Sequence, residues 1–138
     1  MADKKLKVVL ITPNQILFSG DADLVNVPGS LSPFEILYNH APIVSALDRG
    51  KIRLFDKKEG ENIFLTSEGF VEVSKNKVSI LVERAENFAN LTIKDIENNI
   101  NKIKAKLLNP ELNEAEKHSL QKELIFEEYC QKILNSIT

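Results

Sequence analysis

The sequence has one cysteine, no tryptophan, two histidines and only five glycines among its 138 residues. A single cysteine excludes an intrachain disulfide and a cysteine metal cluster. The glycines fit neither a phosphate-binding loop nor a dinucleotide-binding fingerprint, because neither spacing occurs. No HxH, HExxH or CxxC pattern is present, so we expect no zinc site. No GxSxG motif marks a nucleophilic serine.

Long hydrophobic runs are also lacking. A membrane span needs about 18 consecutive apolar residues, and no segment approaches that length. The stretch before Pro13 has too few apolar residues for the core of a signal peptide. The net charge of −2 is spread evenly, with 11 basic and 12 acidic residues up to residue 91 and 7 and 8 after it. We therefore expect a soluble or peripheral protein without a nucleic-acid partner.

The first part of the chain, up to about Arg84, contains runs of four to seven apolar residues separated by turn residues. Such runs predict strands. The predicted strands are Leu6–Ile11, Gln15–Ser19, Ala22–Val27, Phe34–Leu37, Ile43–Leu47, Lys51–Phe55, Asn62–Thr66, Phe70–Val73 and Lys77–Val82. Short strands with turns every 8–12 residues are typical of an antiparallel sandwich or barrel.

After Arg84 the apolar residues recur every three or four positions, which predicts a helix. Its apolar stripe consists of Ile93, Ile96, Ile100, Ile103 and Leu107. Thr92 and Asp95 fit a capping box at the start of this helix. Pro110 lacks an amide donor and ends the helix just before it.

A second helix is expected from about Asn113, as N-cap, to Ile137. Its apolar residues form a rougher stripe of Leu120, Leu124, Tyr129, Ile133 and Ile137. Two helices joined by about five residues make an antiparallel hairpin. We place a β-sandwich domain in residues 1–86 and the helical hairpin in residues 87–138, with residues 84–90 as a hinge candidate.

His40 is the strongest candidate for chemistry. A general base needs a polar partner, and its sequence neighbours supply only Tyr38 and Asn39. Pro42 favours extended geometry at the residue before it and marks the entry to a strand. The sequence therefore favours a structural or interface role for His40 over catalysis. Cys130 is interpreted as a small buried or half-buried side chain of the second helix rather than a reactive thiol.

Three segments, in order and at matching spacing, resemble one known family. "LKVVLITPNQILFSGDADLVNVPG" resembles the opening of the epsilon subunits of bacterial F-type ATP synthases, with its Thr-Pro, Phe-Ser-Gly and Val-Pro-Gly. "ILYNHAPIVSALDRGKIRL" resembles the next block, which carries His-Ala-Pro and a later glycine. "SEGFVEVSKNKVSILVERAE" resembles the third block, and a helical hairpin follows where the family has one.

The resemblance implies a β-sandwich of about ten strands followed by a two-helix hairpin. It implies a non-catalytic central-stalk subunit of the rotor of a proton-translocating ATP synthase, without a cofactor; sodium coupling stays open. The sandwich would bind the gamma subunit and the c-ring. The hairpin would be regulatory, extending toward the alpha/beta hexamer to inhibit ATP hydrolysis. The protein would be peripheral, on the cytoplasmic face of the bacterial inner membrane.

The resemblance also assigns site residues. Two loops would face the c-ring and gamma, with the partner-binding residues Ser30, Leu31, Ser32, Pro33, Tyr38, Asn39, His40, Ala41 and Pro42. The stripe of the first helix, from Ile93 to Leu107, would be the switch surface. The family's ATP-binding motif is degenerate here at Asp95, Asn98 and Asn99: only Asp95 remains, and Asn98 stands where an arginine is expected. No arginine fork for phosphate is available, so weak or no ATP binding is expected.

Two other interpretations remain open from the residues alone. One is a free-standing protein-interaction adaptor with a β-sandwich and a coiled-coil-like hairpin. The other is a small hydrolase, for which the sequence offers no recognisable site. Formation of a complex with a gamma subunit separates the rotor subunit from the adaptor.

Overall fold

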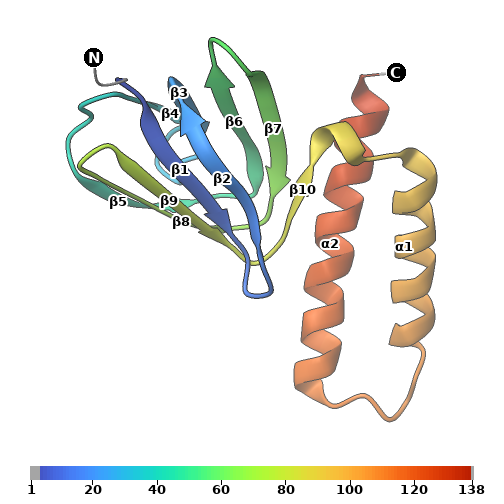
Figure 1. Ribbon diagram of the computed structural model, residues 1–138. Coiled ribbons are helices and arrows are strands. Elements are labelled where there is room, and N and C mark those ends of the chain that lie inside the picture. The colour runs from blue at the N-terminus through green and yellow to red at the C-terminus, as the bar shows by residue number, and fades with distance from the viewer. Residues whose placement is uncertain (1–3, 138) are drawn as a thin grey trace. The chain divides into compact units, whose positions relative to one another are not determined.

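The computed structural model describes residues 4–137, which form two compact units that meet between Ala89 and Asn90. The first unit is a sandwich of two five-stranded sheets and the second is a pair of helices (Figure 1). The predicted sandwich followed by a helical hairpin is thus confirmed. The boundary predicted between residues 86 and 87 lies within the last strand of the sandwich.

Sheet 1 has the strand order β2-β1-β9-β8-β5. These strands are β2 (Ile16–Ala22), β1 (Leu6–Ile11), β9 (Lys77–Val82), β8 (Gly69–Ser74) and β5 (Ile43–Leu47). β1 and β9 pair in parallel, whereas the other neighbours in the sheet are antiparallel. Because alternate residues of a strand point to opposite faces, Leu6, Val8 and Leu10 of β1 are buried in the sandwich core.

Sheet 2 has the strand order β10-β7-β6-β3-β4, and all its pairs are antiparallel. Its strands are β10 (Ala85–Asn87), β7 (Gly60–Thr66), β6 (Gly50–Asp56), β3 (Leu24–Val27) and β4 (Phe34–Leu37). Ile36, Ile52 and Leu54 face the side chains of sheet 1 across a single apolar core. The nine predicted strands all exist: four have the predicted ends, and the ends of the other five differ by one to three residues.

The tenth strand, β10, lies in the segment that the sequence interpretation treated as a hinge candidate. Residues 85–87 pair with β7, and the amide of Ser67 donates to the carbonyl of Arg84 at 2.9 Å. A three-residue strand with a central glutamate, Glu86, has no alternation long enough to recognise. A short 3₁₀ turn, η1 (Phe88–Asn90), then leads out of the sandwich.

The helical unit consists of α1 (Ile93–Leu107) and α2 (Glu114–Ser136), which pack against each other. The hydroxyl of Thr92 accepts from the amide of Asp95 at 3.2 Å, which is one of the two hydrogen bonds of the predicted capping box. Asn113 and Glu116 form a full reciprocal capping box at the start of α2, so the predicted N-cap is confirmed. The predicted stripe of α1 is apolar and inward: Ile96, Ile100 and Ile103 are buried.

None of the five residues of the stripe predicted for α2 is fully buried, and four of them are half-buried. The buried residues of α2 are Phe126, Glu127, Cys130 and Leu134, while Ile137 is 62% exposed. The predicted stripe contained a five-residue step, from Leu124 to Tyr129, which turns too far around a helix to stay on one face. The burial expected for Cys130 is confirmed. Among residues 4–137, no helix has the length and apolar character that spanning a membrane requires.

Candidate partner-binding surface

The first predicted loop, Ser30–Pro33, connects β3 to β4 and is anchored at its base. The amide of Ser30 donates to the carbonyl of Ala46 at 3.0 Å, and its hydroxyl donates to Asp48 Oδ1 at 2.9 Å. Gly29 is buried there, and a Cβ at this position would lie 2.5 Å from the carbonyl oxygen of Ser32 and 2.8 Å from the ring of Phe34, so the site requires glycine. Held by these contacts, the loop exposes the Leu31 side chain completely.

The second predicted loop, Tyr38–Pro42, crosses from β4 in sheet 2 to β5 in sheet 1. Asn39 adopts the left-handed conformation with φ of 66°, and the amide of His40 donates to the carbonyl of Leu37. A second turn supports the first: the amide of Asn39 donates to Asn76 Oδ1 at 2.6 Å, and Asn76 Nδ2 donates back to Asn39 Oδ1 at 3.2 Å. The two asparagines therefore fix the position of the Tyr38–Asn39 turn.

His40 is occupied by its own loop. Its Nδ1 lies 2.7 Å from the carbonyl oxygen of Ala41, so the ring donates to the backbone when Nδ1 carries the proton. The ring is half-buried, and its centroid lies 6.3 Å from that of Phe34. This is the structural role that the sequence interpretation preferred to catalysis.

The two predicted loops do not form one patch. Ser30–Pro33 precedes β4, and the Tyr38–Asn39 turn follows it, so they lie at opposite ends of this strand. The first loop lies beside the end of β5 at Leu47, and the second lies beside the β8–β9 turn. Any partner that contacts both loops must extend along the side of the sandwich where β4 and β5 form the edges of the two sheets.

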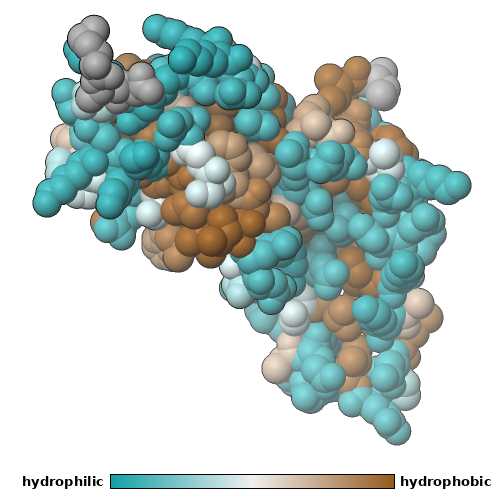
Figure 2. Space-filling view, in the orientation of Figure 1, coloured by the Kyte–Doolittle hydropathy of each residue, from teal (hydrophilic) through white to brown (hydrophobic). Residues whose placement is uncertain are grey.

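A larger candidate surface, which the sequence interpretation missed, covers the outer face of sheet 1. One ladder of directly paired residues crosses the five strands, and all its members are apolar. This apolar band consists of Ala46, Phe70, Leu81, Ile11 and Ile16. Phe70 is 58% exposed, Leu81 is 47% exposed and Ile16 is 62% exposed. Figure 2 shows brown side chains gathered on the side of the sandwich where Figure 1 draws β1, β8 and β9.

The rest of this face becomes polar along the strands. The middle ladder mixes Val44, Glu72, Ser79, Val9 and Ser19. The last ladder, which we call the polar ladder, consists of Ser74, Lys77, Lys7 and Asp21. Contiguous exposed apolar side chains with a polar border are typical of protein-binding surfaces. The alternation in "GFVEVS" could have shown that Phe70 points outward, but not that four apolar neighbours lie beside it.

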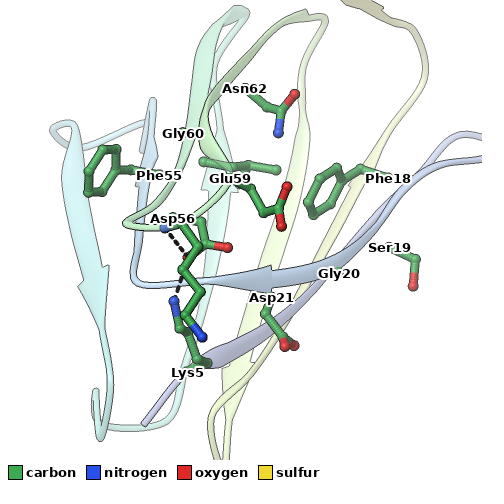
Figure 3. Close-up of a pocket in the computed structure, with 12 residues that line it drawn as sticks. Lys5, Phe18, Ser19, Gly20, Asp21, Phe55, Asp56, Glu59, Gly60 and Asn62 are labelled. Carbon is green, nitrogen blue, oxygen red and sulfur yellow. Dashed lines mark hydrogen bonds and ion pairs between the residues drawn. The ribbon is translucent and has the colours of Figure 1, made fainter. Parts of the chain in front are cut away.

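A pocket of about 450 Å³ opens between β2 and the turn from β6 to β7 (Figure 3). At its floor, Lys5 Nζ lies 3.0 Å from Asp23 Oδ2 and also hydrogen-bonds Asp56. Hydrogen bonds to Asp56 and Asp23 raise the pKa of Lys5. The backbone amide of Lys57 and then Lys5 lower the pKa of Asp23, and Lys5 lowers that of Asp56. Because its ammonium group is already paired twice, Lys5 ties strand ends together rather than offering a charge to a ligand.

The helical unit uses the positions of the degenerate motif for its own structure. Asp95 lies in the first turn, with its amide bonded to Thr92. Asn99 Nδ2 lies 3.4 Å from Glu127 Oε1 and joins α1 to α2. Asn98 is exposed. Within residues 4–137, no group of three histidine, cysteine, aspartate or glutamate side chains is arranged to hold a metal ion.

The matching family model and the similar curated proteins name the same family. The model of the beta-sandwich domain of the ATP synthase delta/epsilon chain matches residues 5–88. The ATP synthase epsilon chain of Francisella tularensis subsp. holarctica is 31% identical over 136 residues, which cover 99% of this chain and 93% of that relative. The epsilon chain of Chlorobium limicola is 40% identical over 82 residues, covering 59% of this chain and 93% of that relative. The latter relative is therefore little longer than the sandwich unit alone.

Solved structures show the same fold. A chain in the cryo-EM structure of the Euglena gracilis mitochondrial ATP synthase, with OSCP, F1 and c-ring, superposes with a TM-score of 0.66. The superposition covers 96% of this chain and 82% of that chain, at 16% sequence identity. At that identity the likeness supports the fold, while the family rests on the sequence matches.

Proposed function

The chain belongs to the family of ATP synthase epsilon chains, and we propose that it is a non-catalytic subunit of the rotor of a proton-translocating enzyme. In this role it transmits rotation between the catalytic head and the c-ring. The observation that carries the proposal is the apolar band on the outer face of sheet 1, in a domain that belongs to this family. A surface of that kind fits a protein that assembles with other subunits.

The apolar band is the surface that binds the gamma subunit. Phe70 and Leu81, on the neighbouring strands β8 and β9, provide adjacent large side chains at its centre. Large aromatic and aliphatic side chains that become fully desolvated contribute most of the binding energy of an interface. The loops Ser30–Pro33 and Tyr38–Pro42 contribute contacts to the c-ring and to gamma. In the first loop, the fully exposed Leu31 is the natural anchor.

The helical hairpin regulates the enzyme rather than assembling it. The Chlorobium limicola relative is named an epsilon chain although it is about as long as the sandwich alone. The buried stripe of Ile96, Ile100 and Ile103 is the surface that could exchange between two docking positions. A shift of the hairpin between two docking positions needs a difference in binding free energy of only a few kcal/mol. In the extended state the helices contact the alpha/beta hexamer and inhibit hydrolysis.

The proposed location follows from the assembly. The protein is held at the cytoplasmic face of the bacterial inner membrane through its contacts with other subunits, as a peripheral component. Its contact with the polar loops of the c-ring places the protein close to the membrane surface.

The test uses the full chain, the gamma subunit from the same organism and the ATP synthase reconstituted with either the full chain or residues 1–90. We expect the full chain to co-elute with gamma in size-exclusion chromatography as a stable complex. Lack of any complex would favour the free-standing adaptor. Omitting residues 91–138 is expected to leave assembly intact and to raise ATP hydrolysis. Equal hydrolysis with both forms would show that the hairpin is not a brake.

A further inference from the structure

Two lysines lie side by side on the outer face of sheet 1. Lys7 of β1 and Lys77 of β9 are direct partners in the parallel pair, so both side chains point away from the core. The Lys7 side chain is 76% exposed, and its closest carboxylate, Asp21, is 4.0 Å away and 52% exposed. Two like charges that face each other across neighbouring strands destabilise the sheet that carries them. The exposed ion pair with Asp21 offsets only one of the two lysine charges, so this face keeps an excess of positive charge.

A third lysine is presented by the adjacent turn. Lys75 and Asn76 form the two-residue connection between β8 and β9, with φ of 51° and 62°. Asparagine tolerates this left-handed conformation, whereas lysine adopts it only at a cost in free energy. An ordered residue in an unfavourable conformation is a reason to look for a function. The amide of Lys7 donates to the carbonyl of Asn76 at 2.9 Å, so this turn and the exposed Lys75 lie at the Lys7 end of the sheet.

Few negative charges accompany this cluster on the same face. Asp21 is the neighbour of Lys7 on β2, and Glu72 lies diagonally from Lys77 on β8. Among the described residues, Glu72 has no ion pair with Lys77 at 4.0 Å or less. The three lysines thus keep a local positive charge although the whole chain has a net charge of −2.

We propose that Lys7, Lys75 and Lys77 bind an acidic segment of the gamma subunit, the partner proposed to cover the apolar band. This inference rests on the proposed function, in which gamma covers sheet 1. Lys7 and Ile11 are four residues apart on β1, so roughly 13 Å separates the lysines from the band. A standard interface buries about 800 Å² on each partner and easily covers that span. Carboxylates placed between Lys7 and Lys77 would remove the repulsion present in the free chain.

The chemistry of this face favours a protein carboxylate over other anions. A nucleic acid or an anionic membrane presents a dense array of phosphates, which Asp21 and Glu72 would repel. A protein partner can instead place single carboxylates at the lysines and leave room for both acidic side chains. The arrangement orients the partner, because one end of the face accepts apolar side chains and the other accepts negative charge. Such complementarity acts mainly on the association rate and on specificity.

The experiment compares the full chain with its double variant Lys7→Gln/Lys77→Gln, and uses Lys51→Gln as the control. Lys51 is an exposed lysine on β6 of the other sheet. Association with the cognate gamma subunit is followed by stopped-flow at about 50 mM and about 500 mM salt, where screening lengths differ about threefold. We expect the double variant to associate about tenfold more slowly at low salt, with the difference lost at high salt. The control should behave as wild type.

Stability gives a second readout, because removing a repulsive pair does not weaken the fold. The thermal midpoint of the free double variant should equal or exceed that of wild type, which a purely structural role for the lysines would not allow. Equal association rates for all three proteins would overturn the inference. Binding of the wild type to vesicles with anionic lipid or to duplex DNA, lost in the double variant, would also overturn it. If the wild-type chain does not bind gamma at all, that result contradicts the proposed function itself and not only the role of the lysines.

Discussion

Replacing Phe70 by serine tests the apolar band most sharply. A phenylalanine buries about 150–250 Å², and 58% of Phe70 is exposed in the free chain. A partner that covers it would therefore bury roughly 90–145 Å² more. At about 25 cal/mol per Å², this area contributes roughly 2–4 kcal/mol to binding. We expect Phe70→Ser to raise the Kd for gamma by about 30-fold to several hundredfold.

The assay is a titration of gamma with the full chain, read by calorimetry or fluorescence anisotropy. Two further variants provide a matched comparison, because Leu81 in the band is 47% exposed and Leu37 on the outer side of β4 is 48% exposed. Burying the rest of a leucine of this exposure contributes roughly 1 kcal/mol. Leu81→Ser should weaken binding about fivefold, and Leu37→Ser should leave it unchanged.

Thermal denaturation of each free variant excludes a general loss of structure. If Phe70→Ser and Leu81→Ser remained folded and bound gamma as tightly as wild type, the apolar band would not be the gamma-binding surface. The reasoning would be refuted equally if Leu37→Ser weakened binding as much as Leu81→Ser, because the partner would then cover the other sheet.

Other predictions concern the sandwich and the hairpin. Gly69→Ala should destabilise the fold by about 2–3 kcal/mol, because the new Cβ would lie 2.0 Å from the carbonyl oxygen of Leu81; an unchanged thermal midpoint would contradict this. Lys5→Met should lower the thermal midpoint at pH 7. The difference in midpoint from wild type should become smaller as the pH falls below 3.8, because Asp23 and Asp56, whose pKa values are lowered in the folded chain, then lose their charge. It should also become smaller above pH 10.5, because Lys5, whose pKa is raised, then deprotonates. An equal difference at pH 3 and pH 7 would rule this out. The isolated chain should bind ATP weakly or not at all, and a micromolar Kd from calorimetry would show otherwise.

Much of the fold could be predicted because its local signals agree with its tertiary structure. Alternation marks β8, and the three-to-four spacing marks α1, whose Ile96, Ile100 and Ile103 are buried. Capping residues are equally informative: Thr92 caps α1 and Asn113 caps α2. Each of these features depends on a residue and its near neighbours in sequence.

The features that were missed depend on packing between distant segments. β10 exists because residues 85–87 pair with β7, about twenty residues earlier, and nothing local indicates it. The apolar band requires the strand order of sheet 1, including the parallel pairing of β1 with β9 across some seventy residues. Without that register, Ile11, Phe70 and Leu81 are three unrelated outward side chains. The resemblance pointed to loops, and the sheet face became visible only in three dimensions.

The central claim is that the outer face of sheet 1 is covered by the gamma subunit. Hydroxyl-radical footprinting of the full chain, alone and with its cognate gamma, measures this directly, since it reports the exposure of individual side chains. We expect a marked loss of oxidation at Phe70 and Leu81 in the complex, with Leu37 unchanged. Equal oxidation of Phe70 and Leu81 in the free and bound states, or protection of Leu37 in their place, would contradict it.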